Sequence, residues 1–190
     1  MYCGGETRAR RNPEAGPWIF AGVSIVVAGA LILLIRRSWA NSDVLELMRK
    51  ELNPSQRKMA QLIANEFKAA GFPPVAQAAA IVNAWVESTL NPNASGDSGH
   101  SIGLFQLHDA GGGAGLSVEY RANPINNTRT ILEREVLGHF GKRFRQRVAD
   151  GAKVGELAAI FSQDIERPAD VEGNKALRAS LAEQWFPTLA

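Results

Sequence analysis

The longest apolar stretch of the chain, Trp18 to Ile35, contains 18 residues and no charged side chain. At a helical rise of about 1.5 Å per residue, it would span about 27 Å, close to the thickness of a bilayer core. Arginines lie on both sides of this stretch, and Trp18 and Trp39 stand at its ends, as is typical of membrane interfaces. The pattern therefore predicts a transmembrane helix over 18–35.

A cleaved signal peptide is the alternative for this segment, because Ser38 and Ala40 are small residues at the spacing of a cleavage site. The apolar run is longer than the usual signal core, and Arg36 and Arg37 stand between the run and that site. We therefore favour the uncleaved anchor. Positive charges occur on both sides, so charge does not set the orientation.

After residue 41 the hydrophobic positions recur mostly at helical spacing. The predicted helices are a short one from Ser42 to Leu52, one capped by Ser55 and ended by Gly71, one from Pro74 to the residues before Pro92, and three more near 124–149, 153–165 and 173–185. From 91 to 122, Gly, Pro, Asn and Ser predominate, which predicts a loop with at most a short strand around 102–107. The fold class expected is mainly α, with minimal strand content.

The domain organisation expected is a tail over 1–17, the membrane helix over 18–35, a linker with a short helix over 36–54, and one domain over 55–190. The hydrophobic share of 45% in 190 residues is enough for a sizeable core. A single cysteine, Cys3, excludes an intrachain disulfide framework and a four-cysteine zinc site.

The net charge of +2 is unevenly distributed along the chain. The first 40 residues carry five basic and two acidic side chains, so the remaining 150 carry 16 and 17, a net of −1. The basic end belongs to the membrane segment, and no nucleic-acid partner is expected. The basic run from Lys142 to Arg147 is interpreted as a solvated helix face, with contact to acidic polymers or nucleic acid as the alternative.

A candidate acid stands at the end of the helix that begins at Pro74. Ala80, Asn83, Ala84 and Glu87 share one helical face, which places a carboxylate at the end of a stripe of small residues and beside a glycine-rich loop. Burial there would raise the pKa of the carboxyl group. A solvated glutamate in the last helical turn is the plain alternative.

The residues that follow resemble the signature of the lysozyme-like superfamily of peptidoglycan glycosidases. The resemblance is carried by Glu87-Ser88, by Asn91-Pro92, and by the run Ser-Ile-Gly-Leu-Phe-Gln from Ser101 to Gln106. The form Gly-Leu-Phe-Gln-x-His, which ends at His108, is similar to the lysozyme domains of phage tails and virions. The segment FSQDIERP over 161–168 is similar to an element of the same domains. The resemblance covers about residues 55–185 and implies a lysozyme-like fold.

Goose-type lysozymes are similar in a Gly-Asp pair nine residues before the glutamine, which corresponds to Asp97 here. In that family the aspartate helps to position the attacking water, whereas the position of their second acid is His108 in this chain. The resemblance implies Glu87 and Asp97 as catalytic residues. It also implies a set of residues that bind the N-acetyl sugars: Ser101, Gly103, Phe105, Gln106 and His108.

The activity implied is a muramidase that cleaves the β-1,4 bond between MurNAc and GlcNAc, with Glu87 as general acid and Asp97 as assisting base. A lytic transglycosylase, which needs no base and forms 1,6-anhydro products, is one alternative. A membrane protein that binds glycan without cutting it is another. No cofactor is expected, and no metal, since His100, His108 and His139 lack the spacing of metal ligands.

Peptidoglycan lies outside the cytoplasmic membrane, so this activity requires the domain on the wall-facing side of a virion membrane or a bacterial cytoplasmic membrane. The expected partners are peptidoglycan strands, a bilayer and, in a virion, other membrane or capsid proteins.

Two further short segments of the domain are interpreted from their residues. The run Gly111 to Gly115 is interpreted as a mobile rim, and Glu166-Arg167 as a structural ion pair, with a place beside the site as the alternative.

Overall fold

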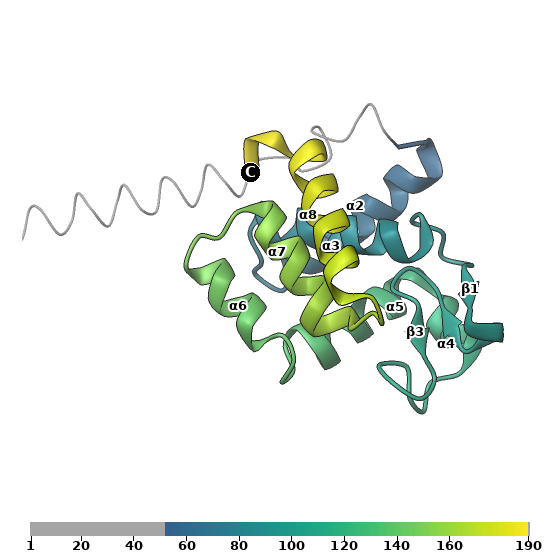
Figure 1. Ribbon diagram of the computed structural model, residues 1–190. Coiled ribbons are helices and arrows are strands. Elements are labelled where there is room, and N and C mark those ends of the chain that lie inside the picture. Colours follow the sequence, from purple (N-terminus) through teal and green to yellow (C-terminus); the bar gives the residue numbers. More distant parts are fainter. Residues whose placement is uncertain (1–51, 190) are drawn as a thin grey trace, which may run out of the picture. The chain divides into compact units, whose positions relative to one another are not determined.

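The computed structural model describes residues 52–189 (Figure 1). The predicted tail, the predicted span over 18–35 and nearly all of the predicted helix from Ser42 to Leu52 lie outside the described residues. Among the helices within 52–189, none combines the length and apolar character that a bilayer crossing requires.

The first described helix, α2 (Pro54–Ala69), begins earlier than the sequence predicts. Asn53 forms its N-cap: the Asn53 side chain accepts from the Gln56 amide at 2.9 Å, and the Gln56 side chain accepts from the Asn53 amide at 3.0 Å. The prediction of Ser55 as cap is therefore wrong, because Pro54 fits the first helical position and does not break the chain there. The predicted end is confirmed, since Gly71 has a φ of +87° just after the helix.

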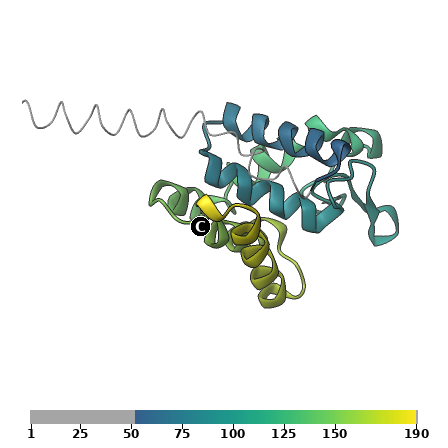
Figure 2. The same ribbon diagram turned by 90° about the horizontal axis from the view of Figure 1, so that it is seen from above.

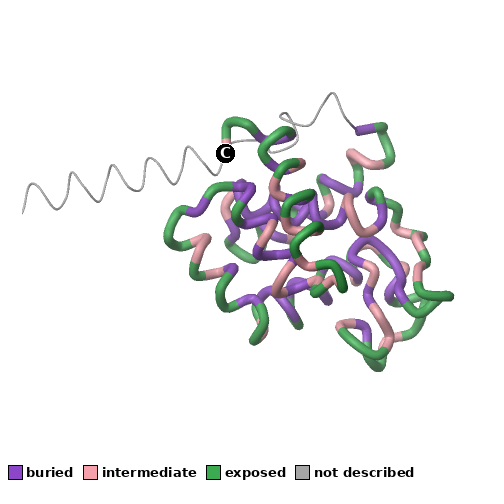
Figure 3. Tube along the Cα trace, viewed as in Figure 1, coloured by how far each residue is buried: buried purple, intermediate pink, exposed green. Residues whose placement is uncertain are grey.

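Helix α3 (Pro74–Ser88) is central and begins at Pro74 as predicted. It packs against α2, α7 (Val154–Ile160) and α8 (Val171–Trp185), and every residue from 74 to 84 is buried. Figure 2 shows α2 and α3 side by side, and Figure 3 shows the buried chain concentrated at this centre. A helix covered on several faces needs small side chains for close approach, and the alanines of α3 provide them.

The glycine-rich region forms a small antiparallel sheet beside the helices (Figure 1). Its strands are β1 (Ser95–Gly96), β2 (Ser101–Ile102) and β3 (Leu107–His108), in that order, with Ser95 opposite Ile102 and Ser101 opposite His108. The sequence predicts at most one strand here. Two-residue strands are too short to show an alternating pattern, so hydrophobic periodicity does not reveal them.

The single helix predicted over 124–149 is wrong. The structure has instead a short helix α4 (Val118–Ala122), then α5 (Pro124–Thr130) continuing into a π-helical turn, η2 (Ile131–Val136), and, after a bend, α6 (Lys142–Ala149). Glycines make the bend possible: a Cβ on Gly138 would collide with the Arg134 carbonyl, and one on Gly141 with the Val136 carbonyl.

The predictions of helices near 153–165 and 173–185 are confirmed to within a few residues. Helix α7 continues into a second π-helical turn, η3 (Phe161–Glu166), and α8 is followed by a 3-10 turn, η4 (Pro187–Leu189). Phe161 is fully buried, and its ring centroid lies 6.4, 6.0 and 5.5 Å from those of Phe67, Phe105 and Phe144. This aromatic cluster joins the sheet region to the helices. The described domain is thus mainly helical with a minimal sheet, as the sequence predicts.

Candidate active site

Glu87 lies in the last turn of α3, where the chain reverses sharply. Thr89 and Leu90 follow directly after α3 and have φ values of 53° and 58°, so two successive residues adopt the left-handed conformation. The Glu87 side chain keeps 21% of its surface exposed at this end of the helix. Glu87 is therefore a largely buried carboxyl group with one side open to solvent.

The stripe of small residues that leads to Glu87 is a packing surface. Ala80, Asn83 and Ala84 are fully buried, and the Asn83 side chain donates to the Ala158 carbonyl of α7 at 3.2 Å. The stripe thus brings α7 close to α3 one turn before Glu87. This contact positions the carboxyl group and leaves no room for a ligand along the stripe.

An arginine that the sequence does not single out lies directly against Glu87. Arg178, on α8, donates from Nη2 to Glu87 Oε1, and from Nη1 to Ser162 Oγ at 2.6 Å and Asn174 Oδ1 at 3.1 Å. Its side chain is only 1% exposed. The two partners are 91 positions apart in the sequence, so no local motif marks Arg178. In the sequence it is one basic residue of an ordinary helix.

The pKa of Glu87 is raised above the usual glutamate value. Burial is the largest cause; the Arg178 charge and hydrogen bond oppose it, and the Asp97 charge adds to it. The carboxyl group therefore keeps its proton at a higher pH than an exposed glutamate does. That property suits a general acid.

Asp97 reaches the site from the 3-10 turn η1 (Asp97–Gly99) between β1 and β2. It is exposed and has a φ of 48°, and its Oδ2 accepts from Ser101 Oγ at 2.6 Å. The effect of Asp97 on the pKa of Glu87 places the two carboxylates in one electrostatic environment. Ser101, predicted to bind sugar, uses its hydroxyl to orient Asp97.

Gln106 and Gly103 form the tight turn between β2 and β3. The Gln106 side chain donates to the Gly103 carbonyl at 2.9 Å and the Ala94 carbonyl at 3.2 Å, and the residue has a φ of 44°. Gly103 has a φ of +86° and donates its amide to Ala94 at 2.9 Å. Both predicted residues therefore shape the hairpin through their own bonds.

Phe105 does not lie where a sugar could reach it. Its ring is 1% exposed and stacks on Phe161, and its amide donates to Asn127 Oδ1 at 3.0 Å. The interpretation of Phe105 as a residue that contacts substrate is not supported by this placement. An apolar residue between two turn residues packs inward because the core is the only apolar environment available to it.

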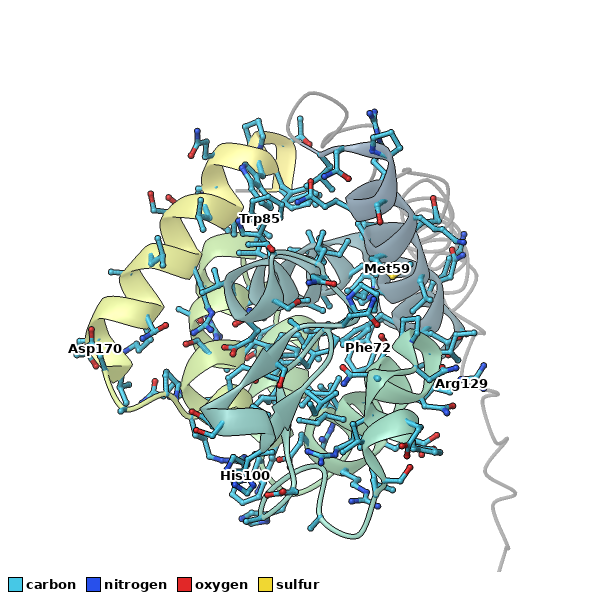
Figure 4. The ribbon with its side chains drawn as sticks, turned by 90° about the vertical axis from the view of Figure 1, so that its right-hand side faces the viewer. Met59, Phe72, Trp85, His100, Arg129 and Asp170 are labelled. Atoms are coloured by element: carbon cyan, nitrogen blue, oxygen red, sulfur yellow. The ribbon has the colours of Figure 1, made fainter. Side chains whose placement is uncertain are left out.

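His108 lies at the outer edge of the hairpin with His100, which Figure 4 shows at the far end of the sheet region from Trp85. The two rings stack with centroids 5.8 Å apart, and His100 Nδ1 lies 2.8 Å from Asp109 Oδ2. The hydrogen bond with His100 is the main cause that holds the pKa of the Asp109 carboxyl below its usual range. His108 is therefore part of an exposed polar cluster.

Two buried residues that the sequence does not single out hold the hairpin in place. Asn127 accepts from the Phe105 amide and donates to the carbonyls of Ile102 and Arg121, at 3.0, 2.9 and 2.8 Å. Arg121 donates to the Leu107 carbonyl at 2.8 Å. A buried polar side chain with three partners is expected to rigidify the loop that carries Asp97 and Gln106.

Glu166 brings a further carboxyl group to the surroundings of Glu87. The Glu87 charge and, above all, burial raise the pKa of Glu166 well above its usual value. The neighbouring Arg167 forms its ion pair with Glu135, at 2.9 Å. Arg167 therefore pairs with Glu135 and not, as one interpretation predicts, with Glu166. The alternative prediction, that Glu166 lies beside the site, describes Glu166 better.

Two of the four basic side chains in the run from Lys142 to Arg147 form ion pairs within the domain. Arg143 pairs with Asp164 at 2.6 Å, Arg147 pairs with Glu156 at 2.7 Å, and Arg145 donates to the Gly138 carbonyl at 2.9 Å. These contacts agree with the interpretation as a solvated helix face. The ion pairs compensate the charges of Arg143 and Arg147.

The glycine run from Gly111 to Gly115 is fastened to the helices. Arg134 donates to the carbonyls of Gly112 and Ala114 at 3.1 and 3.0 Å, and the Gly113 amide donates to the His108 carbonyl at 2.9 Å. These bonds argue against the mobile rim that the glycine content predicts. The partners of the run in these bonds come from η2 and β3, which the local sequence does not reveal.

Comparison with known proteins agrees with this architecture. Residues 58–189 match the family described as phage tail lysozyme. No curated protein matches the chain. The matched region includes both candidate catalytic residues and Arg178.

Proposed function

The chain belongs to the phage tail lysozyme family, and from this premise we propose that it is a muramidase that cleaves the MurNAc-GlcNAc bond with Glu87 as general acid. The family supports a glycosidase that degrades peptidoglycan and is associated with a phage. The observation that carries the finer proposal is the burial of Glu87, which raises its pKa while one side of the carboxyl group stays open.

Glycoside cleavage requires a proton donor at the leaving oxygen, and that donor must still hold its proton near neutral pH. Burial against α7 and α8 moves Glu87 in that direction. In the proposed reaction, Glu87 protonates the glycosidic oxygen and becomes a carboxylate. Arg178, already bonded to Oε1, stabilises that product state, because its charge lowers the free energy of the ionised form.

Asp97 is proposed as the base that activates water. An inverting hydrolase needs a second carboxylate at a distance from the acid, with room for water between the two. Asp97 is exposed, is oriented by Ser101, and interacts electrostatically with Glu87. A lytic transglycosylase would use the 6-hydroxyl of the muramic acid and would not need Asp97. The role of Asp97 therefore separates the two reactions.

Digestion of purified sacculi with mass spectrometry of the released muropeptides tests both roles. Glu87→Gln is expected to lower the rate by a factor of about 100 or more, since general acid catalysis contributes about 10²–10⁴. Glu172→Gln, a change of the same kind at an exposed position of α8, is the control. Asp97→Asn is expected to slow release of reducing-end products, with exposed Asp150→Asn as control. Anhydro products in the wild type would instead establish a transglycosylase.

A retained rate in Glu87→Gln would refute the assignment of the acid. Binding of sacculi by the wild type without any turnover would refute the enzyme and favour a glycan-binding protein. Each outcome is read at the pH of maximal wild-type activity, so that changes in ionisation do not mimic a loss of the acid.

We further propose that the chain is anchored in a virion or bacterial cytoplasmic membrane through residues 18–35, with the domain facing the wall, where it opens peptidoglycan during genome entry. The length and apolar character of this sequence support the proposal. The full chain is expected to float with phospholipid vesicles. Two arginines introduced at Val26 and Ala30 should abolish flotation, because charges near the bilayer centre are costly.

The lone cysteine provides a test of orientation. With the domain outside, Cys3 lies on the cytoplasmic side of a bacterial membrane. A membrane-impermeant maleimide is expected to label it only after cells that express the chain are permeabilised. Labelling in intact cells would place the domain in the cytoplasm and would exclude access to the wall in this orientation.

A further inference from the structure

One oxygen of the half-buried Glu166 side chain, at the end of η3, is enclosed by the protein. Within the described residues, its Oε1 atom is buried and has no hydrogen-bond partner. A buried polar atom without a partner is destabilising, and more so when the group is charged. An ionised Glu166 is therefore strongly disfavoured in this structure.

Arg178 contacts the π-helical turn that carries Glu166. Arg178 donates to Ser162 Oγ at 2.6 Å, and Ser162 stands one turn before Glu166 on η3. The guanidinium group therefore lies between α3, which carries Glu87, and the π-helical turn that carries Glu166. Its Nε atom, like Glu166 Oε1, is buried without a partner among the described residues. Arg178 is thus bonded to Glu87, and its charge also acts on Glu166.

Several charged groups act on Glu87 and Glu166. Arg178 attracts both carboxyl groups, and the Glu87 charge raises the pKa of Glu166. Arg167 and Glu135 act on Glu166 from η3 and η2 and are paired with each other at 2.9 Å, so their charges largely cancel. Asp97 acts on Glu87 from the exposed hairpin.

Two ionised carboxylates around one arginine leave a net charge of −1 in the protein interior, whereas a single added proton makes the cluster neutral. Neutrality is favoured because desolvation penalises uncompensated charge. Because the Arg178 hydrogen bond stabilises the carboxylate form of Glu87, that bond favours the proton on Glu166.

We propose that Glu166 is a positioning residue that shares one proton with Glu87 across Arg178, and so keeps the general acid supplied with a proton. This inference rests on the proposed role of Glu87. When Arg178 turns toward Glu166, Glu166 releases its proton to water and Glu87 takes up a proton through its open side. Glu87 then gives this proton to the glycosidic oxygen, and Asp97 takes the proton of the attacking water. Release of that proton to solvent lets Glu87 and Glu166 regain one shared proton.

The pH dependence of kcat/KM on sacculi tests this proposal with the full chain. In Glu166→Gln, Glu87 loses its proton without facing a second carboxylate, so the alkaline limb is expected to move to lower pH by about one unit or more. Above that limb the rate falls about tenfold relative to wild type. Asp164→Asn, on the same helix but paired with Arg143, should reproduce the wild-type profile. An unshifted limb in Glu166→Gln, with or without a uniform loss of rate, would overturn the proposal.

A measurement independent of activity separates this proposal from the proposed function. Carbon-13 NMR of the glutamate carboxyl groups follows each titration, with signals assigned from Glu87→Gln and Glu166→Gln. In the wild type the pair should titrate in two separated steps. Each variant should lower the titration of the remaining carboxyl group below the upper wild-type step, so either variant suffices if the other does not fold. Two independent titrations would refute proton sharing, whereas inactivity of the wild type on sacculi would refute only the glycosidase.

Discussion

The hydroxyl group of Ser88 lies 2.9 Å from the Leu104 carbonyl and thereby joins the end of α3 to the hairpin loop. It also lies 2.9 Å from the Ala84 carbonyl, one turn back on the same helix. The Leu104 contact is the tertiary one, and it spans 16 residues between Glu87-Ser88 and the Gly-Leu-Phe-Gln turn. The two parts of the sequence signature are therefore in direct physical contact, and Ser88 is the residue that links them.

Replacement of Ser88 by alanine is expected to destabilise the domain by about 1–3 kcal/mol, because a buried carbonyl loses its partner. The change should also slow catalysis, since the hairpin that carries Asp97 would no longer be fixed to the acid. Urea unfolding of the full chain, with every variant in the same detergent, measures the loss of stability. Ser55→Ala, at an exposed position of α2, is the matched control. Equal stability of the two variants would contradict the proposed link.

Two glycines with left-handed φ values separate backbone strain from steric crowding. Gly115 has a φ of +77° and open space around it, so Gly115→Ala should cost only about 1–2 kcal/mol of strain. Gly103 has a φ of +86°, and a Cβ there would lie 2.6 Å from the Arg121 carbonyl and collide with the Asn127 side chain. Gly103→Ala is expected to cost about 3 kcal/mol or more. A similar loss in the two variants, measured by urea unfolding, would show that Asn127 does not clamp the turn.

Removal of the Arg178 charge should unbalance the carboxyl groups it serves. Arg178→Met is expected to lower the free energy of unfolding by about 3–5 kcal/mol at a pH where Glu87 is ionised, because it leaves a buried charge without its partner. The loss should become smaller as the pH falls, because protonation of Glu87 removes that charge. Arg178→Lys retains a cation and should be less affected. A loss that is independent of pH in the methionine variant would indicate a packing role alone.

The stability of Glu166→Gln should depend on pH in a defined direction. The folded state binds the Glu166 proton more tightly than the unfolded state, because burial raises the pKa above the ordinary value of 4.5. The free energy of unfolding of the wild type is therefore reduced as the pH rises above that value. Glutamine has no proton to lose, so the variant should gain stability relative to wild type between pH 5 and pH 8. A constant difference across this range would mean that Glu166 titrates normally.

The local sequence was sufficient for those features that depend on neighbours along the chain. The periodicity of hydrophobic residues predicts α3 and α8 within a few residues, because helical packing repeats at fixed spacing. The Glu87-Ser88 pair and the turn ending at Gln106 mark a lysozyme-like domain, which the family match over 58–189 confirms. The roles of Glu87 and Asp97 remain predictions.

Features decided by contacts between distant residues required the tertiary structure. Arg178 meets Glu87 across 91 residues, and Asn127 meets Phe105 across 22, at positions with no local pattern to mark them. The burial of Phe105 and the enclosure of Glu166 likewise depend on what packs against them. Propensity and periodicity describe one segment at a time, whereas the pKa of a carboxyl group is set by the charges and the solvent that the whole fold places around it.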